Sequence, residues 1–132
     1  MANLFDLEAL RRRLAAAPEA ARLERLGLQT VVLGDDALAS LPHLVADLVG
    51  ARRAEGPVAI LSDLTPKFYR SVDLLDYVTT TLAARFGVRS VALGTPGHPV
   101  HADEETVVKA TRDCEGAACL VAVGSGDRKS VV

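Results

Sequence analysis

A glycine-rich turn follows the last apolar segment of the sequence. Residues 119–123 read Cys-Leu-Val-Ala-Val, and Gly124, Ser125 and Gly126 come directly after them. An uninterrupted apolar run is typical of a central parallel strand that is covered on both faces. Glycine permits the torsions and the close approach that let main-chain N–H groups converge on an anion. The pattern predicts a phosphate-binding loop, although a plain tight turn has the same residues.

An acidic residue follows an earlier apolar segment. Asp63 comes just after Val-Ala-Ile-Leu at 58–61 and is followed by Leu64 and Thr65. In open parallel sheets, ligands bind beyond the carboxyl ends of the strands, where an acid can accept hydrogen bonds from an adenosine ribose. Asp63 could equally cap a helix that begins near Pro66, since Asp is a favoured capping residue. The residues alone leave both interpretations open.

Other chemically capable residues form weaker patterns. His98 and His101 lie near Asp103, but a zinc or iron site needs three or four converging ligands, so we predict no metal site. Cys114 and Cys119 are expected to be free thiols in a reducing compartment. The segment 126–130 resembles the end of a Walker loop, but Arg128 stands where that motif requires glycine.

Composition restricts the class of protein. The 132 residues suffice for one ordinary domain, with 49% hydrophobic and 24% charged residues and a net charge of −2. No apolar segment approaches the ~20 residues that span a bilayer, and the N-terminus lacks a basic segment followed by an apolar one. Basic residues are scattered. We therefore expect a soluble cytoplasmic protein with neither a nucleic-acid nor a membrane partner.

Hydrophobic periodicity predicts an alternation of strands and helices. Two helical pieces, 4–16 and 19–26, form an N-terminal helical segment, 1–28. Beyond it we predict strands at 30–33, 58–61, 90–93 and 119–123, and helices at 37–49, 66–86 and 103–114. Thr65 is the expected cap of the second of these helices. The β-α-β-α-β-α-β order with short connections predicts an α/β fold, a Rossmann-like doubly wound parallel sheet over residues 29–126.

Several segments together resemble a known family. They are Val-Val-Leu-Gly at 31–34, Ala-Ile-Leu-Ser-Asp-Leu-Thr at 59–65, His-Ala-Asp-Glu-Glu-Thr-Val at 101–107 and Leu-Val-Ala-Val-Gly-Ser-Gly at 120–126. In order and spacing they resemble the N-terminal half of the sn-glycerol-1-phosphate dehydrogenases, in the superfamily of iron-containing alcohol dehydrogenases and dehydroquinate synthases. The resemblance implies a domain that binds NAD or NADP. Asp63 and Thr65 would lie near the adenosine, and Gly124, Ser125 and Gly126 against the pyrophosphate.

The family resemblance also implies a reaction. Such enzymes interconvert dihydroxyacetone phosphate and glycerol 1-phosphate in phospholipid metabolism by hydride transfer with the nicotinamide. A C-terminal domain supplies Asp and two His to a divalent metal, which would be zinc, nickel or iron, and the whole enzyme is expected to be a homo-oligomer. No catalytic residue or metal ligand carries over to this chain, so we expect a cofactor-binding fragment without activity of its own.

Residues 127–132, Asp-Arg-Lys-Ser-Val-Val, depart from the family pattern, in which Thr, an apolar residue and Asp follow the glycines. We interpret them as a non-native tail, because the adapter read GAT CGG AAG AGC GTC GTG encodes the same peptide. A native genomic continuation that encodes this tail would contradict the interpretation.

Two other functions fit the same fold class. A dehydroquinate synthase would use NAD in the same architecture. A phospho-receiver domain would share the acidic pair after the first strand, here Asp35 and Asp36, but requires its acceptor Asp after the third strand and a Lys after the fifth. Asp63 instead follows the second predicted strand.

Overall fold

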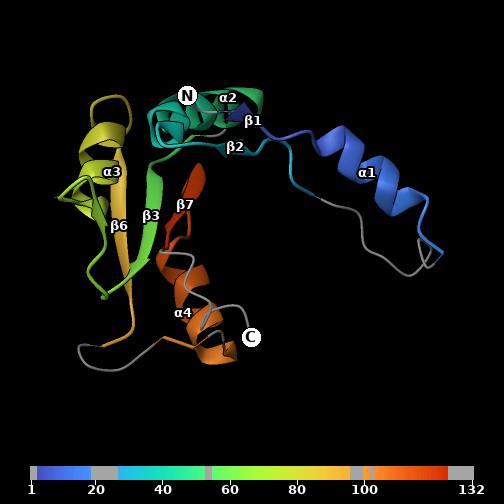
Figure 1. The fold of residues 1–132 in the computed structure, drawn as a ribbon. Coiled ribbons are helices and arrows are strands. Elements are labelled where there is room, and N and C mark those ends of the chain that lie inside the picture. The colour runs from blue at the N-terminus through green and yellow to red at the C-terminus, as the bar shows by residue number, and fades with distance from the viewer. Residues whose placement is uncertain (1–2, 19–26, 53–54, 96–99, 102, 125–132) are drawn as a thin grey trace. The chain divides into compact units, whose positions relative to one another are not determined.

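The chain divides into two compact units. The computed structural model describes residues 3–18, 27–52, 55–95, 100–101 and 103–124 (Figure 1). Contacts within the chain separate Met1–His43 from Leu44–Val132. The helical piece predicted at 19–26 and the tail at 127–132 lie outside the described residues.

The first unit joins its N-terminus to a later strand. β1 (Asn3–Leu4) pairs antiparallel with β2 (Val32–Leu33), and the N–H of Phe5 donates to the carbonyl of Val31 at 2.7 Å. Between them, α1 (Leu7–Ala15) begins where Asp6 accepts a hydrogen bond from the N–H of Ala9 at 2.9 Å. The helix predicted at 4–16 is therefore confirmed, except that its first residues form β1.

The strand predicted at 30–33 does not join the parallel sheet, which is a correction to the expected order of elements. β2 has only two residues, and its partner is β1. Leu33 is exposed. Short β-branched segments can pair in either direction, because what they require is a partner and a surface to pack against. The helix predicted at 37–49 is present as a 3₁₀ turn, η2 (Ala37–Ser40), followed by α2 (Leu41–Arg52).

The second unit is built on a parallel sheet of three strands in the order β6-β3-β7. β3 (Val58–Asp63) lies in the middle, between β6 (Val88–Leu93) and β7 (Cys119–Val123). Val58 is level with Val88 on one side and with Cys119 on the other. Val58, Ala59 and Ile60 are each at most 1% exposed. The α/β class and the three later strands are thus as predicted, and β3 provides the centre of the core.

β7 is an edge strand among the described residues, so the prediction of a central strand at 119–123 is wrong. It pairs there with β3 alone. Cys119 and Val123 are buried, whereas Leu120 is 59% exposed and Ala122 is also exposed. Apolar composition is as high in β7 as in β3, and it cannot by itself tell a central strand from an edge strand. The order of strands depends on the connections between them.

A hairpin replaces the first part of the helix predicted at 66–86. β4 (Phe68–Tyr69) pairs antiparallel with β5 (Val72–Asp73) through Arg70 and Ser71, whose φ angles are +49° and +66°. α3 (Leu74–Ala83) begins only afterwards, with the Asp73 carboxylate accepting from the N–H of Asp76 at 2.9 Å. Thr65 is therefore not a helix cap. Phe68 and Val72 have helical spacing, yet they are 70% and 49% exposed.

Helices complete the core of the second unit. Val78 and Leu82 of α3 are buried. α4 (Glu104–Asp113) leads into Cys114, which packs in a cluster with Ala59 and Val91. The helix predicted at 103–114 is confirmed. Among the described residues, no helix combines the length and the apolar character needed to cross a membrane.

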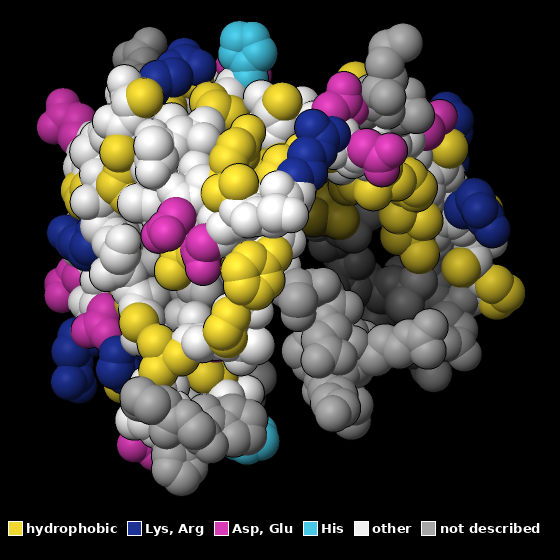
Figure 2. Space-filling model, turned by 60° about the vertical axis from the view of Figure 1, so that its left-hand side comes forward, with side chains coloured by type: hydrophobic (Ala, Val, Ile, Leu, Met, Phe, Trp, Pro, Cys, Tyr) yellow, Lys and Arg dark blue, Asp and Glu magenta, His cyan; other side chains and the backbone are white. Residues whose placement is uncertain are grey.

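The surface carries both hydrophobic and charged side chains. On the face drawn in Figure 2, hydrophobic side chains lie among acidic and basic ones. Those most exposed in the second unit include Phe68, Val107 and Leu120.

Candidate functional site

The direction in which the chain adds strands to the sheet reverses between β3 and β7. From β3 the chain passes through α3 to β6 on one side, and from β6 it returns through α4, across β3, to β7 on the other side. Crossovers between parallel strands are right-handed, and two such crossovers in opposite directions put their helices on opposite faces of the sheet. A crevice between the carboxyl ends of the strands is expected at such a switch point.

Two of the predicted site residues lie at the ends of neighbouring strands at this switch point. Ser62 is level with Val123 in the parallel register, so Asp63 and Gly124 come next on adjacent strands. The sequence placed both residues after strands, and the structure places those strands side by side. Ser125 and Gly126 lie outside the described residues. We call the carboxyl ends of β3 and β7, with the loop 63–67, the switch-point edge.

Asp63 is held by the loop that follows it. Its Oδ1 accepts a hydrogen bond from the N–H of Thr65 at 3.1 Å and forms an ion pair with the ammonium of Lys67. Within the described part of the chain, no partner bonds Oδ2, and the side chain is 38% exposed. Asp63 therefore caps a turn rather than a helix, and one carboxylate oxygen remains able to accept a hydroxyl.

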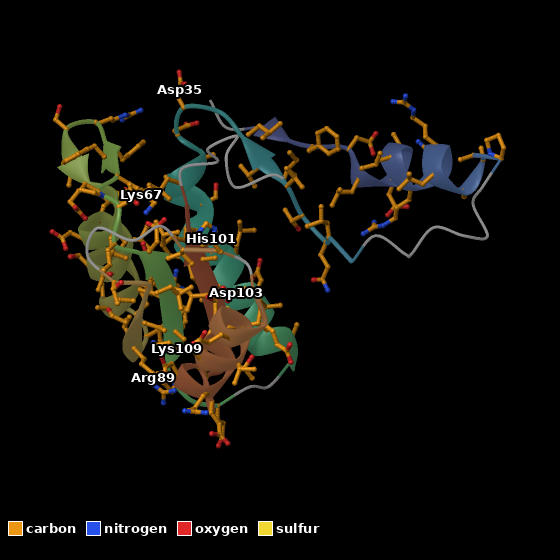
Figure 3. The ribbon with its side chains drawn as sticks, turned by 90° about the horizontal axis from the view of Figure 1, so that it is seen from below. Asp35, Lys67, Arg89, His101, Asp103 and Lys109 are labelled. Atoms are coloured by element: carbon orange, nitrogen blue, oxygen red, sulfur yellow. The ribbon has the colours of Figure 1, made fainter. Side chains whose placement is uncertain are left out.

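Lys67 is the feature of this site that the sequence did not indicate (Figure 3). Its side chain is only 7% exposed. Besides the ion pair with Asp63, its ammonium donates to the carbonyl of Thr65 at 2.9 Å. An ammonium has three N–H groups, so one has no bond to the described residues. The helix predicted at 66–86 puts Lys67 in its first turn, where the ammonium would need no ion-pair partner. The signal available was its position four residues after Asp63.

The pair has a clear electrostatic consequence. The hydrogen bond from Lys67 holds the pKa of the Asp63 carboxyl below its ordinary value of 3.8, and the N–H of Thr65 acts in the same direction. Partial burial opposes them. Asp63 is accordingly an ionised acceptor at neutral pH, and its negative charge is locally compensated by Lys67.

Thr65 belongs to the same loop. Its main chain donates to Asp63 and accepts from Lys67, and the residue is exposed. Both peptide groups on either side of its Cα are thus engaged. The structure brings Thr65 next to Asp63, as the sequence suggested: its N–H donates to Asp63, and its side chain also helps to lower the pKa of that carboxyl.

Gly124 is not required by the chain's own packing. A Cβ at this position would meet no atom of the described residues within 4 Å, and Gly124 is not among their glycines with positive φ. By contrast, a Cβ at Gly56 would lie 2.3 Å from the carbonyl oxygen of Gly116. The backbone at Gly124 is therefore open to an approaching group, and the phosphate-binding role of residues 124–126 stays a prediction.

The histidine segment shows no metal site in the part of the chain that the structure describes. His98 lies outside that part, and no group of three metal-ligating side chains gathers within it. Asp103 instead caps α4: its carboxylate accepts from the N–H of Thr106 at 2.8 Å. Hydrogen bonds with Thr106 are the main reason why the pKa of Asp103 is lowered from 3.8. Cys114 and Cys119 are buried and form no disulfide in the part of the chain that the structure describes.

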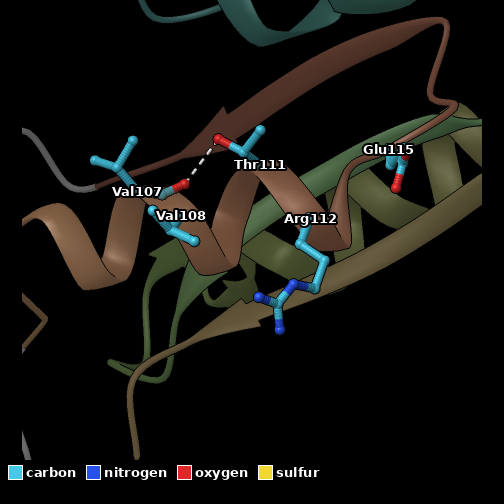
Figure 4. Close-up of a pocket in the computed structure, with 5 residues that line it drawn as sticks. All are labelled: Val107, Val108, Thr111, Arg112 and Glu115. Carbon is cyan, nitrogen blue, oxygen red and sulfur yellow. Dashed lines mark hydrogen bonds between the residues drawn. The ribbon is translucent and has the colours of Figure 1, made fainter.

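A shallow hollow on α4 lies apart from these residues. It is open to solvent and is lined by Val107, Val108, Thr111, Arg112 and Glu115 (Figure 4). All five are exposed. It shares no residue with the switch-point edge.

Comparison with known proteins identifies no relative. No protein-family model, no curated protein and no solved structure matches the chain.

Proposed function

We propose that the switch-point edge binds the adenosine and pyrophosphate part of a nicotinamide dinucleotide, NAD or NADP. The observation that carries the proposal concerns the adjacent parallel strands β3 and β7. Asp63 is the last residue of β3 and Gly124 directly follows β7, at the place where the order in which strands are added to the sheet reverses. Dinucleotide-binding folds use this place for an acid that accepts ribose hydroxyls and for a glycine turn that admits the pyrophosphate. In this proposal the sheet is the core of a Rossmann-like doubly wound domain.

Each residue has a distinct part in the proposed complex. Asp63 Oδ2 accepts a hydrogen bond from a ribose hydroxyl, while Oδ1 stays with Lys67 and Thr65. The open backbone at Gly124 allows close approach of the pyrophosphate, and Ser125 and Gly126 continue that loop by the sequence prediction. Thr65 contributes its exposed side chain next to the adenosine.

The reaction is proposed on the family resemblance. The resemblance favours the cofactor-binding part of a glycerol-1-phosphate dehydrogenase that acts on a small phosphorylated substrate. It favours this function over a dehydroquinate synthase or a receiver domain. The metal of that family would polarise the substrate oxygen as a Lewis acid. On that resemblance the metal ligands belong to a C-terminal domain, so we propose cofactor binding for this chain and no catalytic step.

Binding can be tested with the 132-residue chain. We expect NAD⁺ or NADP⁺ to bind in calorimetric titrations and to raise the melting temperature, since a ligand of the folded state stabilises it. Asp63→Ala should weaken binding about tenfold, because the hydroxyl loses a charged acceptor. Asp47→Ala, which changes an exposed aspartate on α2, is the matched control and should leave affinity unchanged.

Two results would contradict the proposal. One is the absence of saturable binding by either dinucleotide to a chain that is folded by circular dichroism. The other is equal weakening by Asp63→Ala and Asp47→Ala.

A further inference from the structure

We infer that Lys67 makes the switch-point edge tolerant of a phosphate on the ribose 2′ position, and that it does so by compensating the charge of Asp63. The inference rests on the proposed function and names the ligand class that the edge accepts, a 2′-phosphorylated adenosine as well as a 2′-hydroxyl one. It concerns a specificity-determining residue that acts through Asp63.

The starting point is the chemistry of a lone carboxylate at a ribose site. An ionised Asp that accepts the 2′-hydroxyl also repels a 2′-phosphate, because both groups are anionic and lie within a few ångströms of each other. An aspartate at the end of the strand thus ordinarily excludes the phosphorylated ribose. Asp63 by itself predicts that exclusion.

Lys67 changes the charge of the site. Its ammonium forms an ion pair with Asp63 Oδ1 and also donates to the carbonyl of Thr65. The Lys67 side chain is only 7% exposed, so the surrounding protein holds its position. A buried ammonium is screened less by salt than an exposed one. Asp63 and Lys67 together carry no net charge toward a ligand.

The loop keeps this arrangement in register with the strand end. Asp63 Oδ1 binds the N–H of Thr65, and Lys67 binds the carbonyl of Thr65, so both charged groups are tied to one residue. The carbonyl of Lys67 in turn accepts from the N–H of Leu74 at 2.8 Å, where the hairpin β4–β5 joins α3. Lys67 is therefore fixed from its side chain and from its main chain.

The test compares two probes that differ by one phosphate, adenosine 5′-monophosphate and adenosine 2′,5′-bisphosphate. We expect the full chain to bind both. Lys67→Met keeps the apolar stem but removes the charge, and should weaken the bisphosphate about tenfold relative to the monophosphate. Raising the salt concentration should reduce that difference, because it screens the repulsion by Asp63.

A second variant keeps the inference falsifiable if Lys67→Met unfolds. Asp63→Asn with Lys67→Met removes both charges and leaves no buried ion unpaired. It should restore the ratio of the two affinities to within about twofold of the wild type, because the repelling carboxylate is gone. Lys67→Arg should keep the wild-type ratio, since it retains the positive charge.

The outcomes separate the inference from the proposed function. If both probes bind and the ratio is unchanged in Lys67→Met, or is not restored in the double variant, the role of Lys67 is wrong while nucleotide binding stands. If neither probe binds the folded wild-type chain, the proposed function itself is wrong and the inference falls with it.

Discussion

At the scale of single residues, the arrangement around Asp63 shows how a common residue type acquires a specific role. The carboxylate is ionised and uses one oxygen for its own loop. The other oxygen has no partner among the described residues. This division of labour follows from the short segment between Asp63 and Lys67, which is long enough for the lysine to fold back on the acid.

The ion pair predicts a pH dependence of stability. Folding lowers the pKa of Asp63 below 3.8, so the stabilisation is fully present above the unfolded pKa and is lost as pH falls through the folded one. Asp63→Asn should therefore lower the free energy of unfolding at pH 7, and the difference from the wild type should shrink below about pH 3.8. The carboxylate is 38% exposed but its partner Lys67 is only 7% exposed, so the effect should exceed the roughly 0–1 kcal/mol of an ordinary surface pair.

Denaturant unfolding of both proteins at pH 7 and at pH 3 measures this difference. The two pH values lie on either side of 3.8, the ordinary pKa of the carboxyl, below which the stabilisation starts to be lost. A difference that stays constant or grows toward pH 3 would show that the ion pair does not form in solution.

At the scale of elements, helix boundaries are determined by capping residues. α3 begins at Asp73 and α4 at Asp103, and each carboxylate accepts from the N–H three residues later. Both starts come after a turn or loop that leaves backbone donors without partners. The misassigned helix at 66–86 shows the converse. Thr65 and Pro66 look like a start, but Thr65 is already engaged with Asp63 and Lys67.

The cap of α4 offers a test at this scale. Asp103→Ala should lower the free energy of unfolding by more than Asp113→Ala does, because it leaves the N–H of Thr106 without its acceptor. Asp113→Ala is the matched control at the other end of the helix. It removes a surface pair with Lys109 and should cost at most about 0.5 kcal/mol.

Chemical denaturation followed by circular dichroism compares the two variants. Equal effects of Asp103→Ala and Asp113→Ala would mean that the cap adds nothing beyond a surface charge.

At the scale of the whole molecule, the strand order determines which apolar residues matter. Ile60 in β3 is 1% exposed, whereas Leu120 in β7 is 59% exposed. Both are large aliphatic residues in strands that are mainly apolar. Their difference comes from position in the sheet, since β3 has a strand on each side and β7 is paired on one side among the described residues.

Truncating these two residues tests the strand order. Ile60→Ala should cost about 2–5 kcal/mol, because it removes buried apolar surface and leaves a cavity. Leu120→Ala should cost less than about 1 kcal/mol, as expected for an exposed side chain. The measurement is the free energy of unfolding from denaturant titration. A cost at Leu120 that matches the cost at Ile60 would indicate that β7 is covered in solution.

The sequence predicted the elements better than their arrangement. The strand starting at Val58 and the helix after Asp103 follow from hydrophobic patterning and capping, which are local properties. The hairpin at 68–73 was missed, because the spacing of Phe68 and Val72 fits a helical face equally well. The positive φ of Arg70 and Ser71 has no signal in residues that are neither Gly nor Asn.

The candidate site, too, could be predicted only in part from the sequence. Asp63 and Gly124 could be selected because each follows an apolar run, and parallel strands end at a common edge. Lys67 could not be selected, since its burial depends on the loop folding back toward Asp63. Only the structure, in which Ser62 is level with Val123, shows that β3 and β7 are neighbours.

By itself, the sequence determined the three strands of the parallel sheet, the helix after Asp103 and the residues that follow the strands, because these depend on side-chain periodicity and on neighbours a few residues away. The tertiary structure alone decided that β3 rather than β7 is central and that Lys67 compensates Asp63. Both depend on which distant segments pack together, and many segments of this chain are equally apolar.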